Sequence, residues 1–261
     1  MIKVGLLGYG KAGKAVARVI NADPRFDLCW IAKRSTSAET PMDESGKIPL
    51  IGLESIDFSK WLDAHPVDAI IDFSSPDALQ RVGDAVQKRC ITLVSAISSY
   101  SPEQIAFVHG LGQRTRVLYS PNMTLGINFL ILAAKLLRSI APFADVEILE
   151  QHFKEKPEVS GTARKIAESL SVGSEKITSL RLGGIVGHHE VIFGFPYQTV
   201  RLTHDSIKRE AFGTGAIFAL GELAACDIGF YTFDDLLMKK LKQQLSGNTP
   251  NHHDQIASNR T

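Results

Sequence analysis

The stretch Ile2–Ala22, with the sequence IKVGLLGYGKAGKAVARVINA, decides the fold of this chain. The apolar run Ile2–Leu7 predicts a buried strand, and the apolar spacing within Lys14–Ala22 predicts a helix. The segment Gly8–Gly13 between them has the pattern G-x-G-x-x-G. At a strand-to-helix turn this pattern is typical of dinucleotide binding, so the sequence predicts an α/β domain that begins with such a unit.

Each glycine of this loop has its own expected purpose. Gly8 permits a tight turn, Gly10 lets a pyrophosphate approach the backbone, and Gly13 lets the helix pack closely on the strand. The loop residues expected to contact the cofactor are Gly8, Gly10, Lys11, Ala12 and Gly13. The alternative interpretation is a simple turn that binds nothing.

The end of the second strand indicates which dinucleotide binds. A strand predicted over Phe26–Ala32 is followed by Lys33 and Arg34, where an acidic residue would hold the ribose 2′-hydroxyl of NAD. Because two cations stand there instead, they can accommodate the 2′-phosphate of NADP. We therefore expect Lys33 and Arg34 to bind NADPH, with NADH possible; the alternative is a solvated loop.

Strands and helices continue to alternate up to residue 123. Further strands are predicted over Val67–Phe73, Cys90–Ser95 and Val117–Ser120. Such alternation predicts a parallel sheet with helices on both faces, whose ligands bind beyond the carboxyl ends of the strands. The residues expected to bind the cofactor at these strand ends are Phe73, Ser74, Ala96, Ser98, Ser120, Asn122 and Met123.

The pattern changes after residue 124. A long helix is predicted over Leu125–Ile140, and a last helix over Phe233–Leu245. Three consecutive strands with short connections, expected to pair antiparallel, are predicted over Ile177–Gly184, His188–Phe195 and Gln198–His204. We expect a dinucleotide-binding domain over 1–123, completed by the helix at 230–245, and a smaller α+β domain for substrate binding and oligomerisation over 124–229. The polar tail 246–261 is expected to be disordered.

The stretch Glu150–Ala163, EQHFKEKPEVSGTA, gathers polar groups between a strand predicted to end at Glu150 and a helix predicted to begin at Ala163. An imidazole, an ammonium, two hydroxyls and a glycine come from His152, Lys156, Ser160, Thr162 and Gly161. Lys156 can act as a general acid, and N–H groups at the start of a helix attract carboxylates. We expect a site for a small anionic substrate; the alternative is a solvated loop with a helix cap.

Composition and charge exclude several classes of protein. The 261 residues carry a net charge of +1, which gives no electrostatic case for binding nucleic acid or a membrane. No apolar run is long enough to span a bilayer, and Met1 leads directly into a strand pattern, so we expect no secretory signal. The 3 cysteines are far apart, which favours a cytoplasmic protein without disulfides. No metal site is expected, because the adjacent His188 and His189 would point to opposite faces of a strand.

Segments along the chain share motifs with one enzyme family. They are DFSSP at Asp72–Pro76, SPNMTLGIN at Ser120–Asn128 and EILEQHFKEKPEVSGTA at Glu147–Ala163. In matching order, these segments resemble motifs of the 4-hydroxy-tetrahydrodipicolinate reductases, also called dihydrodipicolinate reductases, and the resemblance extends over residues 2–245. It implies a Rossmann-like cofactor domain, an α+β domain and a homotetramer. It also implies NAD(P)H-dependent reduction of a cyclic dicarboxylate, 4-hydroxy-tetrahydrodipicolinate, in lysine and diaminopimelate synthesis.

The resemblance further implies roles for single residues. His152 fits the family's catalytic histidine, and Lys156 fits the lysine that donates a proton. The positions that fit substrate binding are Phe153, Ser160, Gly161, Thr162 and Arg209.

The chain departs from the family pattern at several places. Phe153 stands where the family has a second, substrate-binding histidine, and 157–159 is one residue shorter than usual. Ala96–Ser99 replaces the family's G-T-T-G beside the nicotinamide, and Pro196–Tyr197 replaces a G-E. These departures leave two alternatives open. One is a related NADP-linked oxidoreductase acting on a different cyclic imine or acid, and the other is a cofactor-binding homologue without enzymatic activity.

Overall fold

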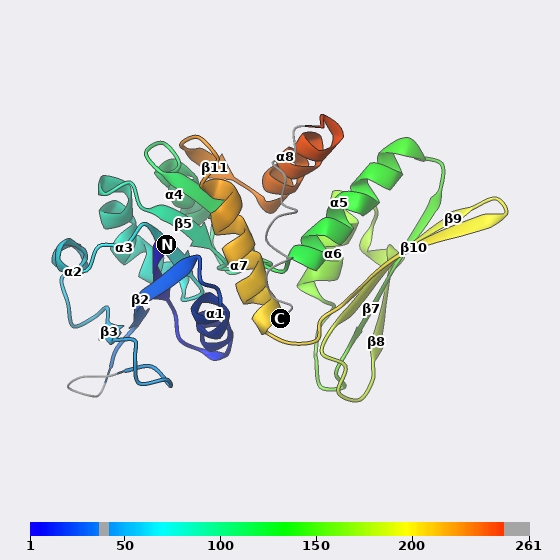
Figure 1. Cartoon of the computed structure of the whole chain (residues 1–261). Helices are drawn as coiled ribbons and strands as arrows, with labels where there is room; N and C mark the ends of the chain where they lie inside the picture. The colour runs from blue at the N-terminus through cyan, green and yellow to red at the C-terminus, as the bar shows by residue number, and fades with distance from the viewer. Residues whose placement is uncertain (37–41, 248–261) are drawn as a thin grey trace, which may run out of the picture.

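The computed structural model describes residues 1–36 and 42–247, which form two sheets with their helices (Figure 1). The strands of the larger sheet are β1 (Ile2–Leu7), β2 (Phe26–Lys33), β3 (Leu50–Gly52), β4 (Ala69–Asp72), β5 (Thr92–Ser95), β6 (Arg116–Tyr119) and β11 (Gly229–Tyr231). They lie in the order β11-β6-β5-β4-β1-β2-β3, and every pair is parallel. The predicted parallel sheet is therefore confirmed; the short strands β3 and β11 were not predicted.

Helices cover both faces of this sheet. One face packs on α1 (Lys11–Ala22), α7 (Glu210–Leu223) and α8 (Phe233–Leu245), and the other on α2 (Phe58–Ala64), α3 (Pro76–Lys88) and α4 (Pro102–Leu111). Consecutive residues of a strand point to opposite faces of the sheet. In β1, Leu6 therefore belongs to the hydrophobic core on the first face and Leu7 to the core on the second. A capping box formed by Ser101 and Gln104 begins α4.

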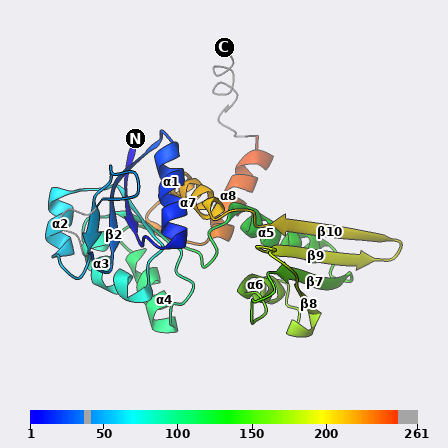
Figure 2. The same cartoon turned by 90° about the horizontal axis from the view of Figure 1, so that it is seen from below.

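The smaller sheet has 4 strands, and the described helices cover only one of its faces. Its strands are β7 (Asp145–His152), β8 (Ile177–Arg181), β9 (His188–Phe195) and β10 (Gln198–Asp205), in the order β10-β9-β7-β8. The helices α5 (Leu125–Ile140) and α6 (Gly161–Ser169) pack on it, and a short 3-10 helix, η1 (Ser174–Lys176), precedes β8. Figure 2 shows the two sheets side by side, with α7 and α8 between them.

The expected pairing of the later strands is wrong in one place. β9 and β10 form the predicted antiparallel hairpin, but β8 pairs with β7, and in parallel. The reason is the helix α6, which returns the chain to the edge where β7 began and so makes a parallel crossover. The loop 182–187 then crosses the carboxyl end of β7 and delivers β9 to its other side.

Two boundaries near the predicted site are also wrong. β7 does not end at Glu150 but continues to His152, which pairs with Arg181 of β8 and accepts a backbone hydrogen bond from Leu182 at 3.0 Å. His152 is therefore held in a sheet rather than on an irregular loop. The helix α6 begins at Gly161 rather than Ala163, because Ser160 caps it.

The C-terminal part of the chain returns to the larger sheet. Leu220 of α7 and Phe233 and Leu236 of α8 lie in the same core as β1 and α1. Lys135 of α5 pairs with Asp234 of α8 at 2.6 Å, which ties the helices of the two sheets together. Within the described residues no helix has the length and apolar character needed to cross a membrane. Most of the tail predicted to be disordered, 248–261, lies outside the described residues.

Candidate active site

The geometry of the glycine loop fits its predicted purposes. Gly8 has φ +91°, and a Cβ built on it would lie 2.4 Å from the carbonyl oxygen of Phe73. A Cβ on Gly13 would lie 2.0 Å from the carbonyl oxygen of Gly8, so the helix packs against the turn itself. A Cβ on Gly10 meets nothing within 4 Å, which leaves the face above the loop open.

The start of α1 has the donors that a pyrophosphate needs. Gly10 is the N-cap residue and makes no side-chain cap, so the helix start relies on other partners for its first N–H groups. These groups belong to Lys11, Ala12 and Gly13 in the first turn of α1, where N–H groups and the positive end of the helix dipole attract anions. The chain therefore fits a dinucleotide at this position.

The other predicted cofactor residues lie at the same edge of the sheet. Because all its strands are parallel, their carboxyl ends gather beside the glycine loop. The residues placed there are Lys33 at the end of β2 and Arg34 after it, Phe73 and Ser74 after β4, Ala96 and Ser98 after β5, and Ser120, Asn122 and Met123 after β6. Met123 is buried, and its carbonyl oxygen lies against Gly215 of α7, so its side chain belongs to the core.

A buried carboxylate, that of Asp72, binds the backbone at this edge of the sheet. Asp72 is fully buried and accepts hydrogen bonds from the backbone and hydroxyl of Ser74 at 2.9 and 2.5 Å. Burial outweighs these bonds and raises the pKa of Asp72 to about 6. The Tyr100 hydroxyl hydrogen-bonds Ser95 at 2.9 Å beside it, and burial raises the pKa of Tyr100.

Asn122 connects the cofactor edge to the second sheet. Its Nδ2 donates to the Thr162 hydroxyl at 3.2 Å, and its Oδ1 accepts from the backbone and hydroxyl of Thr124 at 3.0 and 2.7 Å. Its carbonyl oxygen accepts from Ser120 and Asn128. The structure thus brings a predicted cofactor residue against a predicted substrate residue.

His152 lies on the helix-covered face of its sheet, beside Glu150. The His152 Nδ1 hydrogen-bonds Glu150 Oε2, and Glu150 is completely buried. Burial alone would raise the pKa of Glu150, but hydrogen bonds from Arg181, Ser179, His152 and the Ser160 backbone lower it to about 2. The carboxylate is therefore ionised, and the outer nitrogen Nε2 of His152 faces Gly187, where a Cβ would lie 3.2 Å away.

A second imidazole, His189 of β9, adjoins the first. The rings of His152 and His189 meet edge to face with centroids 5.3 Å apart, and His189 Nε2 hydrogen-bonds the Ser160 hydroxyl at 2.9 Å. Burial, and next electrostatic repulsion by the neighbouring His152, lower the pKa of His189 to about 3, so this ring is neutral. Ser160 also accepts from the Thr162 backbone at 3.2 Å, which fixes the start of α6.

The remaining predicted residues surround this cluster less closely. Lys156 is half-buried in the loop after β7, where its backbone N–H donates to Phe153 at 3.1 Å. Phe153 is 41% exposed, and Gly161 is exposed at the first position of α6. Arg209 is exposed at the N-cap of α7. Among the described residues, no hydrogen bond or ion pair joins the side chains of Lys156 and Arg209 to the cluster around His152.

Sequence reasoning missed three residues of the site: Glu150, Arg181 and His189. One signal was available, because residues two apart in a strand point to the same face, and Glu150 and His152 are two apart. No comparable signal pairs Arg181 with Glu150, since that contact depends on the parallel pairing of β8 with β7.

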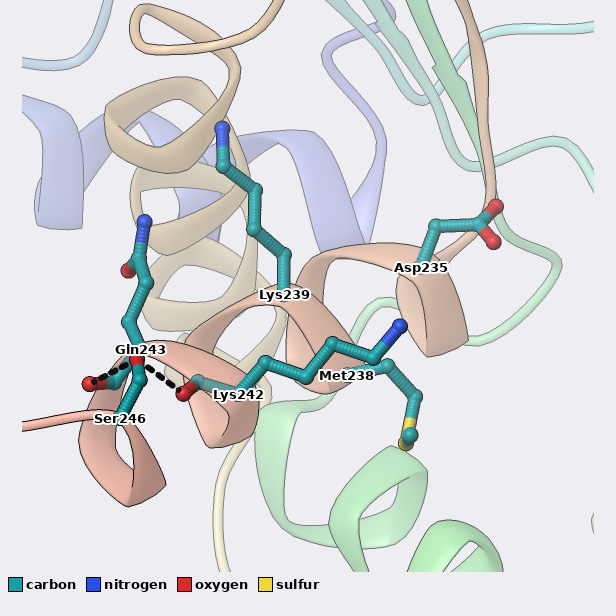
Figure 3. Close-up of a pocket in the computed structure, with 6 residues that line it drawn as sticks. All are labelled: Asp235, Met238, Lys239, Lys242, Gln243 and Ser246. Carbon is teal, nitrogen blue, oxygen red and sulfur yellow. Dashed lines mark hydrogen bonds between the residues drawn. The ribbon is translucent and has the colours of Figure 1, made fainter.

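A hollow elsewhere on the molecule does not belong to this site. Figure 3 shows it on α8, lined by Asp235, Met238, Lys239, Lys242, Gln243 and Ser246. Lys239 donates to the carbonyl oxygen of Ala225 at 2.6 Å, which holds α8 against the end of α7. Its residues include none of those predicted to bind cofactor or substrate.

Comparison with known families agrees with the motifs along the chain. A family model described as dihydrodipicolinate reductase, N-terminus, matches residues 2–123, and one described as dihydrodipicolinate reductase, C-terminus, matches residues 123–237. This chain belongs to the dihydrodipicolinate reductase family. The two matches meet at residue 123. The hydrogen bond between Asn122 and Thr162 therefore joins the N-terminal region of the family to its C-terminal region.

Individual relatives of this family are similar over most of their length. Proteins named 4-hydroxy-tetrahydrodipicolinate reductase include one from Caldanaerobacter subterraneus subsp. tengcongensis, 31% identical over 256 residues, with 88% of this chain and 95% of the relative covered. One from Thermosipho africanus is 29% identical over 238 residues, with 90% and 98% covered. One from Rickettsia rickettsii is 30% identical over 256 residues, with 90% and 99% covered.

Solved structures share the fold. A dipicolinate-bound dihydrodipicolinate reductase from Paenisporosarcina sp. TG-14 superposes with a TM-score of 0.73 at 20% identity, covering 89% of this chain and 97% of the other. A DAP dehydrogenase of C. glutamicum in complex with DAP superposes with a TM-score of 0.55 at 13% identity, covering 95% and 99%. At these identities the likeness concerns the fold alone.

Proposed function

We propose that this chain reduces 4-hydroxy-tetrahydrodipicolinate with NADPH, and with NADH as a possible substitute, in lysine and diaminopimelate synthesis. Membership of the reductase family supports the reaction. The observation that carries the assignment of the site is the hydrogen bond from Asn122 to Thr162, because it joins the cofactor edge of one sheet to the expected carboxylate site beside the other.

The chemistry divides between cofactor and protein. A reduced nicotinamide supplies the hydride, and the protein positions the reactants and supplies a proton. The hydroxylated ring loses water, and the double bond that remains gains the hydride and the proton. His152 and Lys156 are the proton donors we assign. Because Glu150 holds Nδ1 of His152, its Nε2 is the ring atom that can exchange a proton with the substrate.

The start of α6 holds a substrate carboxylate. The Thr162 hydroxyl accepts from Asn122, so its own hydrogen is available to donate. The backbone N–H of Thr162 is used by the Ser160 cap, which leaves the N–H groups of Gly161 and Ala163 as anion donors. Arg209, at the start of α7, is the cation we assign to the second carboxylate.

The preference for NADPH rests on the end of β2. Lys33 closes the strand and Arg34 follows it, exposed, at the edge where the glycine loop lies. A ribose 2′-phosphate suits two cations, whereas the 2′-hydroxyl of NADH needs an acidic partner for tight binding. NADPH therefore binds more tightly than NADH or equally well.

The open face of the smaller sheet supports a homotetramer. Leu149 and Ile192 are half-buried there although no helix of the described chain covers them, and Leu180 is 39% exposed. A second copy of this chain can cover such a face. Light scattering should give four times the 28.5 kDa of one chain, and a mass near 28.5 kDa at micromolar concentration refutes the assembly.

We also propose that the protein is cytoplasmic and that it binds neither nucleic acid nor membranes. Cys29, Cys90 and Cys226 are all free, as is usual in a reducing compartment. The balanced charge supports the absence of a polyanionic partner.

One observation favours a second candidate. Phe153, 41% exposed next to His152, offers an apolar ring where the family has a histidine. This favours a related reductase whose substrate, a cyclic imine or acid, has one polar group fewer.

A coupled assay tests the proposal. The substrate is generated in place by its synthase, and oxidation of NADPH is followed by absorbance. Lys156→Ala should lower kcat by about 10²–10⁴ with NADPH affinity unchanged, because a positioned proton donor contributes about that much. Lys154→Ala, two residues away and exposed, is the matched control. Wild-type turnover by Lys156→Ala overturns the role of Lys156. Binding of NADPH without turnover of this substrate by the wild type overturns the reaction and favours the second candidate, or a homologue that only binds the cofactor.

A further inference from the structure

Glu150 is a buried carboxylate whose two oxygens are fully used. Its Oε1 accepts from Arg181 Nη2 at 2.8 Å, from the Ser179 hydroxyl at 2.8 Å and from the Ser160 backbone at 3.2 Å. Its Oε2 accepts from Arg181 Nη1 at 3.0 Å and from His152 Nδ1. A carboxylate satisfied in this way has one orientation, so it can fix the orientation of each group that it contacts.

Arg181 extends the same network into the loop after β7. Its Nε donates to the carbonyl oxygen of Lys156 at 3.0 Å, and its Nη2 donates to the carbonyl oxygen of Glu158 at 2.7 Å. The planar guanidinium therefore binds the carboxylate with one edge and the loop backbone with the other. The loop that carries Lys156 is tied to the strand that carries His152 through this one side chain.

The contact between Glu150 and His152 also decides which ring nitrogen carries the proton. An ionised carboxylate only accepts, so Nδ1 of His152 must carry a proton, and Nε2 is the nitrogen that can gain or lose one. The charged and titratable side chains around His152 are Glu150 on its own strand, Arg181 on β8 and His189 on β9. Of these, only Glu150 is hydrogen-bonded to the ring of His152 among the described residues.

We propose that Glu150 and Arg181 are positioning residues of the reductase. Glu150 holds Nδ1–H of His152, which leaves Nε2 as the nitrogen that binds the proton and passes it to the substrate. Arg181 holds the backbone from Lys156 to Glu158 at the distance from β7 that brings Lys156 to the same substrate. This rests on the proposed function for its catalytic consequence, whereas the tautomer and the loop geometry can be measured without turnover.

Two variants separate the two effects. Glu150→Gln keeps the shape but replaces an acceptor-only group with an amide that can donate, and kcat should fall by about 10²-fold or more because the proton donor is misdirected. Arg181→Lys keeps one positive charge but lacks the fork that reaches Glu150 and the loop carbonyls together, and kcat should fall about 10-fold or more. In both, KM for NADPH should stay within about twofold, since the cofactor edge is untouched.

The matched control is Glu222→Gln. Glu222 also pairs with a cation, Lys240 at 2.8 Å, and is largely buried, but it lies between α7 and α8. This variant should keep wild-type kcat. Because Glu150→Gln can also fail to fold, each variant is first compared with the wild type by circular dichroism and NADPH calorimetry. If Glu150→Gln is unfolded, Arg181→Lys still tests the proposal.

A nitrogen-15 NMR measurement of the histidine rings tests the tautomer directly. His152 of the wild type should keep Nδ1 protonated throughout a pH titration, with Nε2 as the nitrogen that gains and loses the proton. Arg181→Lys should keep this pattern while Glu150→Gln loses it. A wild-type His152 protonated at Nε2 only overturns the role of Glu150, whether or not the enzyme turns over. Folded variants with wild-type kcat overturn both roles. If the wild type shows no turnover but Nδ1 of His152 is protonated, the proposed reaction is refuted while the positioning role of Glu150 is supported.

Discussion

Replacing Gly10 by valine should abolish cofactor binding while leaving the fold in place. Gly10 has φ −80° and ψ −164°, an extended conformation that a β-branched residue adopts without strain. A Cβ there meets nothing within 4 Å, so we expect a side chain at this position to overlap little within the protein. The added methyl groups occupy only the space above the loop, where the pyrophosphate must approach.

The magnitude follows from the donors at the start of α1. A hydrogen bond to a charged group contributes about 1.5–3 kcal/mol, and displacement of the pyrophosphate removes at least two such bonds from the N–H groups of Lys11–Gly13. The loss of about 3–6 kcal/mol corresponds to a Kd about 10²–10⁴ times higher. Stability should change little, since a poorer N-cap costs at most about 1 kcal/mol, or about 4 °C in Tm.

Calorimetry with NADPH and thermal unfolding measure the two effects separately. Gly13→Ala provides the opposite case, because its Cβ would lie 2.0 Å from the backbone oxygen of Gly8. That overlap should cost about 1–3 kcal/mol or more, so Gly13→Ala should lower Tm by several degrees. Gly221→Val, at an open and exposed position in α7, controls for the substitution itself. If Gly10→Val binds NADPH as tightly as the wild type, the loop is not the cofactor site and the reasoning from its geometry fails.

Further changes have equally definite outcomes. Thr162→Val should raise KM for the dicarboxylate about 10–100-fold with little effect on kcat, because its hydroxyl holds a carboxylate in ground and transition states alike; steady-state kinetics showing a fall in kcat alone would contradict this. Phe153→His should keep or raise kcat/KM on 4-hydroxy-tetrahydrodipicolinate, because it restores a donor to the substrate. A tenfold drop in kcat/KM would show that the site does not use a histidine at this position. Asp72→Asn should gain stability relative to the wild type as pH rises from 4 to 7. The pKa of Asp72 is raised in the folded state to about 6. The wild type therefore has the full stabilising contribution of the protonated Asp72 below the ordinary pKa of 3.8, and it loses this contribution as pH rises through 6. The relative gain is about 3 kcal/mol in urea unfolding, and a difference independent of pH rules it out.

Local patterns in the sequence predicted what depends on neighbouring residues. The glycine spacing placed the turn after β1, because that turn is determined by a few residues of chain. The parallel sheet also followed, since alternating strands and helices leave few other arrangements.

What the sequence did not predict depends on partners far along the chain. The end of β7 was placed two residues early, because His152 is held in the strand by Arg181 and by the loop 182–187. β8 was expected to pair with β9, because a short connection between two strands is typical of a hairpin. In the structure β7 lies between β8 and β9, and no local pattern indicates this. The role of Glu150 needed both facts, so its place in the site became visible only from the fold.

The loop 182–187 offers a place to change what this enzyme accepts. Its ends are fixed by the hydrogen bonds from Leu182 to His152 and from Ser206 to Gly187, while Gly183, Gly184 and Val186 between them are exposed. Doubling the length of such a loop costs only about 0.6 kcal/mol in closure entropy. Insertions after Gly183 can therefore alter the rim beside His152 without disturbing the core. A library of loop lengths at this position is the natural starting point for directed evolution toward larger cyclic acids.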